Sequence, residues 1–518
     1  MKNKVTAIRT FSTLLILVIA AILFESVLAL FDPPKTVWNH IRENLLIEYT
    51  INTVLLVSVS MFLSGIIGTV MAYFVTCYEF FLRKVLSALL YFPLAIPPYI
   101  GAYVYTNMMQ QNGLIADFIG RSIYIPQFWM AVIVFSLFLF PYVYIGVKGY
   151  LSYNMGGYVE NARLLGKGEF SIFVKVVLPI SRSAILSGMI LVGLEILGDF
   201  GVVQYFGLPT FATAIFKSWI NFKDFDSAIR LGGMLLLVVF ILLIIKNYVI
   251  TNKYQSATTT KTIAFQRTKI SIKAQVLMCA PIFLVLLFSL IIPIYQLINW
   301  ALMSFSRVRY ENLIMMLKNT ILITTGVAFL IIIFALILSS YTRVSSKFVK
   351  IFYGKLTLIS YAIPGSVVAM MVILFFIKID NFLNVSLSTT ILMLISAYVL
   401  RYLGAAYENL ENGYQKIGLK YHEASRTLGN SYYTTLFKVD LPILKSFILS
   451  AYSLVFIDLI KELPLTLILR PFNFHTLATQ VYQYASDEML AESAVPSLLI
   501  IIISIFFIIG LIKKEGRR

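Results

Sequence analysis

Cysteine, histidine and charged residues are scarce in this chain, and each scarcity excludes a class of protein. Two cysteines in 518 residues give no disulfide framework, and three scattered histidines give no metal-site spacing. Only 13% of the residues are charged, about half the share of an ordinary soluble protein. No Gly-x-x-x-x-Gly-Lys-Ser/Thr segment occurs, so the chain lacks the loop that cradles ATP phosphates. We therefore expect a non-enzymatic protein that binds no cofactor itself.

Apolar residues are abundant: 59% of the chain is hydrophobic and its mean hydropathy is +0.86. A helix needs about 20 apolar residues to cross a bilayer. About twelve such stretches can be marked, centred near residues 20, 63, 97, 138, 193, 240, 287, 330, 366, 395, 454 and 504. The sequence therefore predicts an all-α polytopic membrane protein surrounded by lipid.

The net charge of +18 does not indicate nucleic-acid binding, because the basic residues gather in alternate loops. Placing the amino terminus in the cytoplasm puts about thirty of the 42 Lys and Arg on that side, as the positive-inside rule requires. No small-x-small cleavage site follows the first apolar run, so we expect it to be a retained span with both termini cytoplasmic. The predicted cytoplasmic segments are Lys2 to Arg9, Arg83 to Lys84, Lys148 to Arg182, Lys246 to Lys273, Arg343 to Lys355, Arg401 to Lys445 and Lys513 to Arg518.

The chain contains an internal repeat. A block in the first half recurs 263 positions later, and flanking motifs recur at spacings of 267 and 266, so the duplication covers most of each half. The matching positions include Glu160 and Glu423, Gly166 and Gly429, Lys175 and Lys438, Pro179 and Pro442, Pro97 and Pro364, and Thr213 and Thr479.

The repeat predicts two parallel six-helix halves. We assign residues 1–250 to the first half and 274–518 to the second, with a cytoplasmic linker at 251–273. The repeated block lies in a cytoplasmic loop near 158–180 and again near 421–443. In each loop we expect a short helix that ends at a glycine, followed by a span that begins at the proline.

This repeated block, Glu-x-Ala-x-x-x-Gly followed after about a dozen residues by Leu-Pro, resembles the EAA signature of ATP-binding-cassette (ABC) importer permeases. The resemblance implies the type I permease architecture and two coupling helices that dock on a separate ATPase, a homodimer that binds Mg-ATP. The first copy has Asn161 at the second signature position, and the second copy has Ser425 at the third. The residues that it assigns to ATPase coupling are Glu160, Ala162, Gly166, Pro179, Glu423, Ala424, Gly429 and Pro442.

Acidic residues occur inside the span that follows each repeated block. Glu195 and Asp199 lie four residues apart, and their counterparts at the same spacing are Asp458 and Glu462. Intramembrane carboxylates are costly and are therefore candidates for a translocation path, where four of them would suit a hard cation, with transient metal contact at Asp199 and Glu462. The alternative is structural: the acids are hydrogen-bonded packing groups, or Lys461 neutralises its neighbours.

The stretch from Lys461 through Pro471 to Glu488 looks like the corresponding part of ferric-iron permeases. This resemblance implies import of Fe(III) across a bacterial cytoplasmic (inner) membrane, delivered by a periplasmic or lipid-anchored binding protein. Fused permeases of this layout also serve thiamine, and related systems carry phosphonates or polyamines, which are the alternative substrates. A proton-coupled secondary transporter with twelve spans in two parallel halves fits the topology as well, but it does not explain two EAA loops. A structural or receptor-like membrane protein is a weaker alternative because of the intramembrane acids and the proline-rich spans.

The longest external segments run from Phe206 to Ser227 and from Phe472 to Ser493. We expect them to meet the binding protein. Asp226 and Glu492, which match across the repeat at a spacing of 266, are the predicted docking residues.

Overall fold

The computed structural model describes residues 2–515 except 32, 34–35, 111–112, 123, 155 and 252–266. Within these residues, eleven helical segments are long and apolar enough to cross a membrane, and a twelfth is a pair, Arg83–Ala95 and Pro98–Met109, bent by 92°. The predicted all-α polytopic fold is confirmed. Its one sheet in the described part of the chain is a two-residue parallel pairing of β1 (Tyr78–Glu79) with β2 (Thr268–Lys269).

Each half supplies six of these segments, joined by short helices. The first half consists of α1 (Lys2–Leu28), α2 (Thr36–Asn44), α3 (Leu46–Cys77), α4 (Arg83–Leu89), η2 (Phe92–Ala95), α5 (Pro98–Met109), α6 (Leu114–Ile119), α7 (Gln127–Asn154), α8 (Gly156–Leu164), α9 (Glu169–Ile172), η3 (Phe173–Val177), α10 (Leu178–Gly198), α11 (Gly201–Tyr205), α12 (Phe211–Phe216), η4 (Lys217–Asn221) and α13 (Phe225–Thr251). The second consists of α14 (Ile272–Leu286), η5 (Leu287–Ile291), α15 (Ile292–Ser304), α16 (Tyr310–Val344), α17 (Lys347–Ala362), α18 (Gly365–Leu383), α19 (Ile391–Ile417), α20 (Lys420–Thr427), α21 (Tyr432–Thr435), η8 (Leu436–Asp440), α22 (Leu441–Ile460), α23 (Pro464–Leu469), α24 (Leu477–Ser486) and α25 (Ala494–Glu515).

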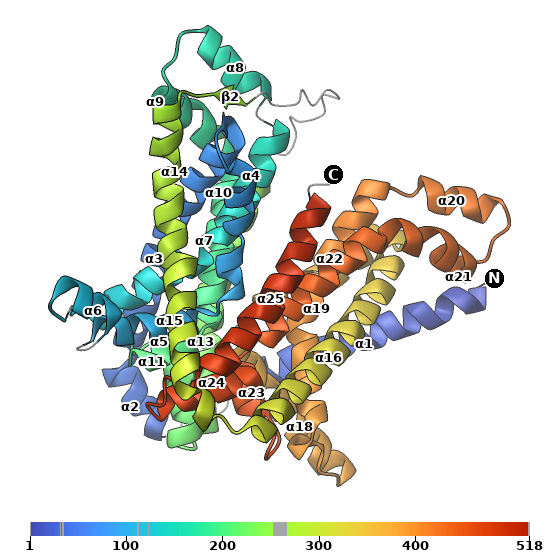
Figure 1. Ribbon diagram of the computed structural model, residues 1–518. Helices are drawn as coiled ribbons and strands as arrows, with labels where there is room; N and C mark the ends of the chain where they lie inside the picture. Colours follow the sequence, from blue (N-terminus) through green and yellow to red (C-terminus); the bar gives the residue numbers. More distant parts are fainter. Residues whose placement is uncertain are drawn as a thin grey trace.

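The helices form two arms that come together at one end and diverge toward the other (Figure 1). The short helices α8 and α20 lie at the diverging ends of the two arms, and α11, α23 and α24 lie where the arms meet. Both chain ends point toward the side that carries α8 and α20. The cores of the arms are the helix groups α3, α7 and α10 and α16, α19 and α22, which pack closely together.

The first span of each half packs on the opposite arm. Helix α1 contacts α16, α17 and α18, and the α14–α15 segment contacts α4, α5 and α7 (Figure 1). Hydrogen bonds support both crossings: the Thr13 and Tyr353 hydroxyls lie 3.2 Å apart, and the Phe81 amide donates to Gln275 Oε1 at 3.1 Å. This exchange ties the halves together, and contacts of α13 with α18 and of α25 with η2 add to it.

The repeat is visible in the backbone hydrogen bonds as well as in the sequence. Thr53 Oγ1 accepts from the Phe211 amide at 3.1 Å, and Thr320 Oγ1 accepts from the Leu477 amide at 2.9 Å. Each contact joins the second span of a half to the helix that begins with a Thr-x-x-Thr capping box. The same side-chain cap therefore fixes the same helix start in both halves.

The spans that contain Pro179 and Pro442 begin earlier than the sequence predicts. Neither proline begins its span, because each membrane helix starts about ten residues earlier, at Glu169 and Tyr432. A π-helical turn, η3 or η8, directly precedes the helix whose first turn holds the proline, and a widened turn accommodates both the ring and the missing amide donor. Most of the predicted linker lies outside the described residues, and its last part forms β2 and the start of α14.

Candidate functional site

A cavity lies between the halves where four membrane helices are interrupted. The interruptions fall between η2 and α5 at Pro97, between α17 and α18 at Pro364, between α10 and α11 at Asp199, and between α22 and α23 at Lys461. Residues from all four interruptions line the cavity. Broken helices are tolerated in a membrane where their free backbone groups face a cavity, so the proline pattern and the cavity have one explanation.

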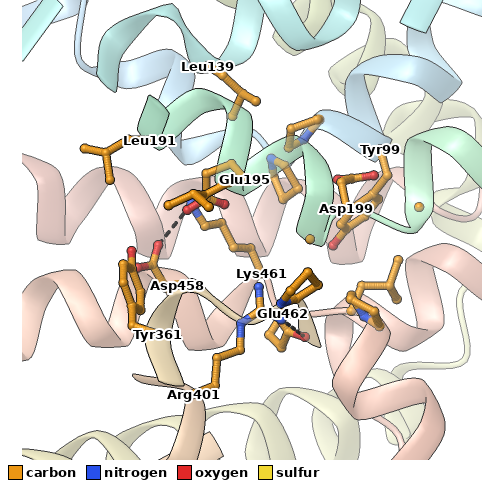
Figure 2. Close-up of a pocket in the computed structure, with 18 of the residues that line it drawn as sticks. Tyr99, Leu139, Leu191, Glu195, Asp199, Tyr361, Arg401, Asp458, Lys461 and Glu462 are labelled. Atoms are coloured by element: carbon orange, nitrogen blue, oxygen red, sulfur yellow. Dashed lines mark hydrogen bonds and ion pairs between the residues drawn. The ribbon is translucent and has the colours of Figure 1, made fainter. Parts of the chain in front are cut away.

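All four predicted intramembrane acids line this one cavity: Glu195, Asp199, Asp458 and Glu462 (Figure 2). They come from α10 and α22, the spans that follow the repeated blocks, and from the breaks that end them. The four acids that the sequence singled out by their spacing therefore lie around one cavity.

Asp199 and Glu462 play the same local role in the two halves. Asp199 Oδ1 accepts from the Val202 amide at 2.8 Å, and Glu462 Oε1 accepts from the Leu465 amide at 2.9 Å. Each carboxylate thus satisfies an amide that the short following helix leaves free. These acids orient the broken-helix ends as well as supplying charge.

The charge environment of the acids differs between the halves. Asp458 lies 3.2 Å from Lys461 Nζ, and Glu462 lies 3.4 Å from Arg401 Nη1 and accepts from the Tyr402 hydroxyl at 2.8 Å. Both carboxylates of the second half are therefore in ion pairs.

The first-half acids have weaker partners. Glu195 accepts a hydrogen bond from the Tyr142 hydroxyl at 3.2 Å, and Asp199 has only its backbone contact. Neither has an ion-pair partner among the described residues. The two first-half acids therefore line the cavity without a cation of the described chain at ion-pair distance.

Arg401 was assigned to the wrong place by the sequence analysis, which put it in a cytoplasmic segment. It lies in the middle of α19, and its guanidinium reaches the cavity (Figure 2). A Cβ added to Gly365 would lie 1.8 Å from Arg401 Nη1, and one added to Gly198 would lie 3.1 Å from Nη2. The signal that could have found it was an arginine flanked by apolar residues on both sides within one span.

The cavity is not a closed metal site. Across the part of the chain that the structure describes, no three His, Cys, Asp or Glu side chains are close enough to hold one metal ion together. The arrangement offers separate carboxylates along a surface, which suits brief contact with a passing ion better than tight storage.

The two repeated blocks have matching geometry on the diverging arm ends. Gly166 and Gly429 have φ of 71° and 84°, and each ends its short helix with the paired hydrogen bonds of a Schellman motif. Two apolar side chains per block are left in solvent at equivalent positions: Tyr158 and Tyr421, each 60% exposed, and Leu165 and Leu428, 77% and 82% exposed. The blocks therefore present matching apolar surfaces outside the membrane-spanning core.

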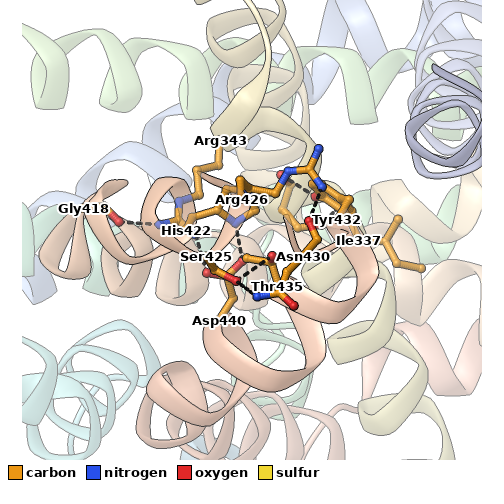
Figure 3. A network of polar contacts seen from close by, with 11 residues as sticks. Ile337, Arg343, Gly418, His422, Ser425, Arg426, Asn430, Tyr432, Thr435 and Asp440 are labelled. Carbon is orange, nitrogen blue, oxygen red and sulfur yellow. Dashed lines mark hydrogen bonds and ion pairs between the residues drawn. The ribbon is translucent and has the colours of Figure 1, made fainter. Parts of the chain in front are cut away.

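The two blocks are anchored differently. In the second, His422 Nδ1 lies 2.7 Å from Asp440, whose other oxygen lies 3.0 Å from Arg343 (Figure 3). Arg343 and Asp440 are 6% and 5% exposed. In the first block, Arg163 pairs with Glu169 at 3.0 Å, and these side chains are 22% and 50% exposed. Helix α20 is therefore held by a buried charge cluster and α8 by a surface pair.

The other predicted coupling residues lie on these blocks. Glu160 and Ala162 are in α8, and Glu423 and Ala424 are in α20. Of the predicted docking residues, Asp226 lies in the first turn of α13, and Glu492 pairs with Arg307 at 3.5 Å. The Glu492 side chain is only 14% exposed, so it is less accessible than we expected for a docking residue.

Two parallel six-span halves, broken helices around a charged cavity and a short helix at the far end of each arm together define a transport permease. A family model for the binding-protein-dependent transport system inner membrane component matches residues 64–260 and 331–513. The chain belongs to this family and carries one copy of its domain in each half.

Known permeases align with this chain over most of its length. It is 24% identical over 445 residues to the Fe(3+)-transport system permease protein FbpB 2 of Haemophilus influenzae, covering 85% of this chain and 84% of that protein. It is 24% identical over 434 residues to the ferric transport system permease protein FbpB of Actinobacillus pleuropneumoniae, covering 76% and 61%.

A shorter similarity is to the sulfate transport system permease protein CysT of Escherichia coli. The two are 30% identical over 155 residues, covering 30% of this chain and 56% of that protein. The resemblance to fused ABC permeases of ferric importers is thereby confirmed, and the match to the sulfate permease extends over part of the chain alone.

Proposed function

We propose that this chain is the membrane-spanning subunit of an ABC importer that moves ferric iron into the bacterial cytoplasm. A substrate-binding protein, periplasmic or lipid-anchored, delivers the iron, and a separate homodimeric ATPase that binds Mg-ATP supplies the energy. The observation that carries the proposal is the alignment with an Fe(3+)-transport permease along 85% of the chain. The cavity chemistry supports it, because carboxylate oxygens favour hard cations.

The same chemistry argues against sulfate as the substrate. Four carboxylates face the cavity against two cationic side chains, Lys461 and Arg401, and both cations are already paired with acids. A divalent anion entering this cavity meets excess negative charge at low dielectric, which raises its energy. Thiamine and polyamines are cations and stay compatible with the cavity, so competition experiments have to separate them from iron.

The transport cycle follows from the two-arm shape. The cavity lies between the arms and α8 and α20 lie at their far ends, so drawing these helices together would rock the arms about the cavity. In the proposed orientation, α8, α20 and both termini are cytoplasmic, and ATP binding closes the ATPase dimer beneath the two helices. Asp226 and Glu492 are proposed to meet the binding protein at the external side.

Uptake of radiolabelled ferric iron tests the substrate. Cells that lack this chain should lose uptake, and cells that produce the Glu195→Gln and Asp199→Asn double variant should show the same loss with normal amounts of protein in the membrane. Excess thiamine, spermidine, phosphonate or sulfate should leave wild-type iron uptake unchanged. Normal iron uptake in the deletion strain, with loss of another of these substrates, would overturn iron and keep the importer.

Apolar-to-charged substitutions test the proposed ATPase contact. Leu165→Asp and Leu428→Asp each place a charge on an exposed apolar side chain that fills no part of the core, so the permease should fold and lose its ATPase in co-purification. The matched control is Phe472→Asp, which changes a 94% exposed apolar residue in the predicted external segment and should retain the ATPase. Equal ATPase retention by all three variants would refute docking at α8 and α20.

A further inference from the structure

A second pocket lies next to the carboxylate cavity on the side where the arms meet. Its lining includes Tyr103 of α5, Gln204 and Tyr205 of α11, and Tyr482 and Glu488 from α24 and the turn after it. Polar and apolar side chains contribute to this lining from both halves. The sequence alone does not indicate this pocket, because its lining residues come from four separate segments with no shared motif.

Tyr99, Gly201 and Leu463 line the carboxylate cavity and do not line the second pocket, and we call their contact the wall between the two spaces. A Cβ added to Gly201 would lie 2.7 Å from the Tyr99 Cβ and 3.0 Å from Leu463 Cδ2, so these three residues pack without intervening space. Tyr99 and Gly201 belong to the first half and Leu463 to the second. Relative movement of the halves would therefore part this wall and connect the two spaces.

Two tyrosines of α5 line the two spaces, one each. Tyr99 lines the carboxylate cavity beside Asp199 (Figure 2), and Tyr103, one helical turn away, lines the second pocket. Their rings are 6.0 Å apart between centroids, and the Tyr103 ring lies 4.6 Å from that of Tyr205. The aromatic row therefore runs from the second pocket to the unpaired acids of the first half.

The hydroxyls of this pair are buried without a partner. Tyr99 and Tyr103 are 3% and 1% exposed, and within the described residues neither hydroxyl makes a hydrogen bond. Leaving a buried hydroxyl unsatisfied costs about 1–3 kcal/mol, and phenylalanine would fill the same space without that cost. The second half has Ser366 and Met370 at the equivalent positions, so the repeat does not require the tyrosines.

We propose that Tyr99 and Tyr103 form an entry path that hands ferric iron, through their phenol oxygens, from the second pocket to Asp199 and Glu195. This inference rests on the proposed function and identifies the residues that the ion meets before the carboxylates. Phenol oxygens are hard ligands that bind Fe(III). On binding, the phenol gives its proton to a water or hydroxide that the hydrated ferric ion carries with it, and the phenol regains the proton as the ion moves on to the carboxylates.

Tyrosine-to-phenylalanine variants test the path, because they remove one oxygen and keep the ring. In the full importer complex, Tyr99→Phe and Tyr103→Phe should each reduce ferric iron uptake by about tenfold, as loss of a group close to a metal's ligands commonly does. The matched control is Tyr105→Phe on the same helix, whose hydroxyl bonds to the Phe288 carbonyl and lines neither pocket. The control should transport iron at close to the wild-type rate.

Spectroscopy gives a readout that a packing role would not change. Ferric nitrilotriacetate added to the purified wild-type complex should produce a visible phenolate-to-iron charge-transfer band, which Tyr103→Phe should weaken and Tyr105→Phe should preserve. Iron uptake by the wild type with no such band, or equal uptake by the three variants, would overturn the path and leave the ferric importer standing. Absence of wild-type iron uptake would instead overturn the proposed function.

Discussion

The two halves of this chain share a backbone plan and differ in the side chains that the plan holds. The glycine turns, the Thr-x-x-Thr caps, the π-helical turns and the carboxylate caps of α11 and α23 all recur at equivalent positions. The ion pairs do not recur: Lys461, Arg401 and the Arg343–Asp440–His422 cluster belong to the second half alone. The turns and helix caps that shape the backbone are therefore the same in the two halves, whereas the charged side chains differ.

This difference indicates a division of labour. The second half pairs its cavity acids with its own cations and holds α20 through a buried polar cluster, so its polar groups are largely structural. Within the described residues, the first half leaves Glu195 and Asp199 without ion-pair partners and adds two tyrosines on α5 whose hydroxyls make no hydrogen bond. We therefore expect substitutions in the second half to affect stability first, and those in the first half to affect transport first.

The largest difference in stability between the halves is expected at the contacts that hold α8 and α20. Asp440→Asn leaves Arg343 buried with no opposite charge, so the free energy of unfolding should fall by about 3–5 kcal/mol. Glu169→Gln breaks a partly exposed pair and should cost only about 0–1 kcal/mol. Titration of the purified variants with SDS in mixed micelles measures both values.

The control for this contrast is the double variant Arg343→Met with Asp440→Asn, which removes the stranded charge. It should recover part of the stability lost in Asp440→Asn, since apolar replacement of a buried pair is often tolerated. Similar losses for Asp440→Asn and Glu169→Gln would show that the burial of the second anchor has no energetic consequence.

The next contrast is between the equivalent capping acids. Glu462→Gln strands Arg401 and should lower stability by about 3 kcal/mol. Asp199→Asn removes an acid with no ionic partner in the described chain and keeps an oxygen for the Val202 amide, so stability should change by less than about 1 kcal/mol while iron uptake falls. Measuring unfolding and uptake on the same preparations separates the two effects. Equal stability losses would show that the halves are not specialised in this way.

Much of this arrangement could be predicted from residue spacing. Period and hydropathy located the twelve spans, and the repeat brought Glu195, Asp199, Asp458 and Glu462 to one cavity. Residue spacing is informative here because glycine turns, helix caps and intramembrane acids are all determined by local sequence. Each half could therefore be interpreted with the help of the other.

What the sequence did not predict depends on contacts between elements. Arg401 lies 61 residues from Glu462, and neither residue specifies the other locally. In the sequence, Tyr99 and Tyr103 look like ordinary apolar positions of a helix, because the pockets that they line form only when the chain folds. The starts at Glu169 and Tyr432 were missed because a π-helical turn lets a membrane helix continue through a proline.

A smaller effect is expected at the two glycines that make room for Arg401. Gly365→Ala places a Cβ 1.8 Å from Arg401 Nη1, and the resulting overpacking should cost about 1–3 kcal/mol. Gly198→Ala, at 3.1 Å from Nη2, should cost less because a slight shift of the flexible guanidinium relieves it. Combining either substitution with Arg401→Met and Glu462→Gln should remove its cost. Persistence of the Gly365→Ala loss in that background would assign it to the backbone instead of to Arg401.

The smallest effect should also be the same in both halves. Gly166→Ala and Gly429→Ala force a left-handed backbone on a residue with a Cβ, although no atom lies within 4 Å of either added Cβ. The cost is then conformational only, about 1 kcal/mol at each site, and equal titration midpoints are expected for the two variants. The contacts that hold α8 and α20 differ. Unequal losses of stability would therefore mean that the buried cluster at α20 resists a change of the turn more than the surface ion pair at α8 does. Equal losses of stability would show that each glycine turn depends on its own backbone conformation alone, and that the two halves differ in their side-chain contacts and not in these turns.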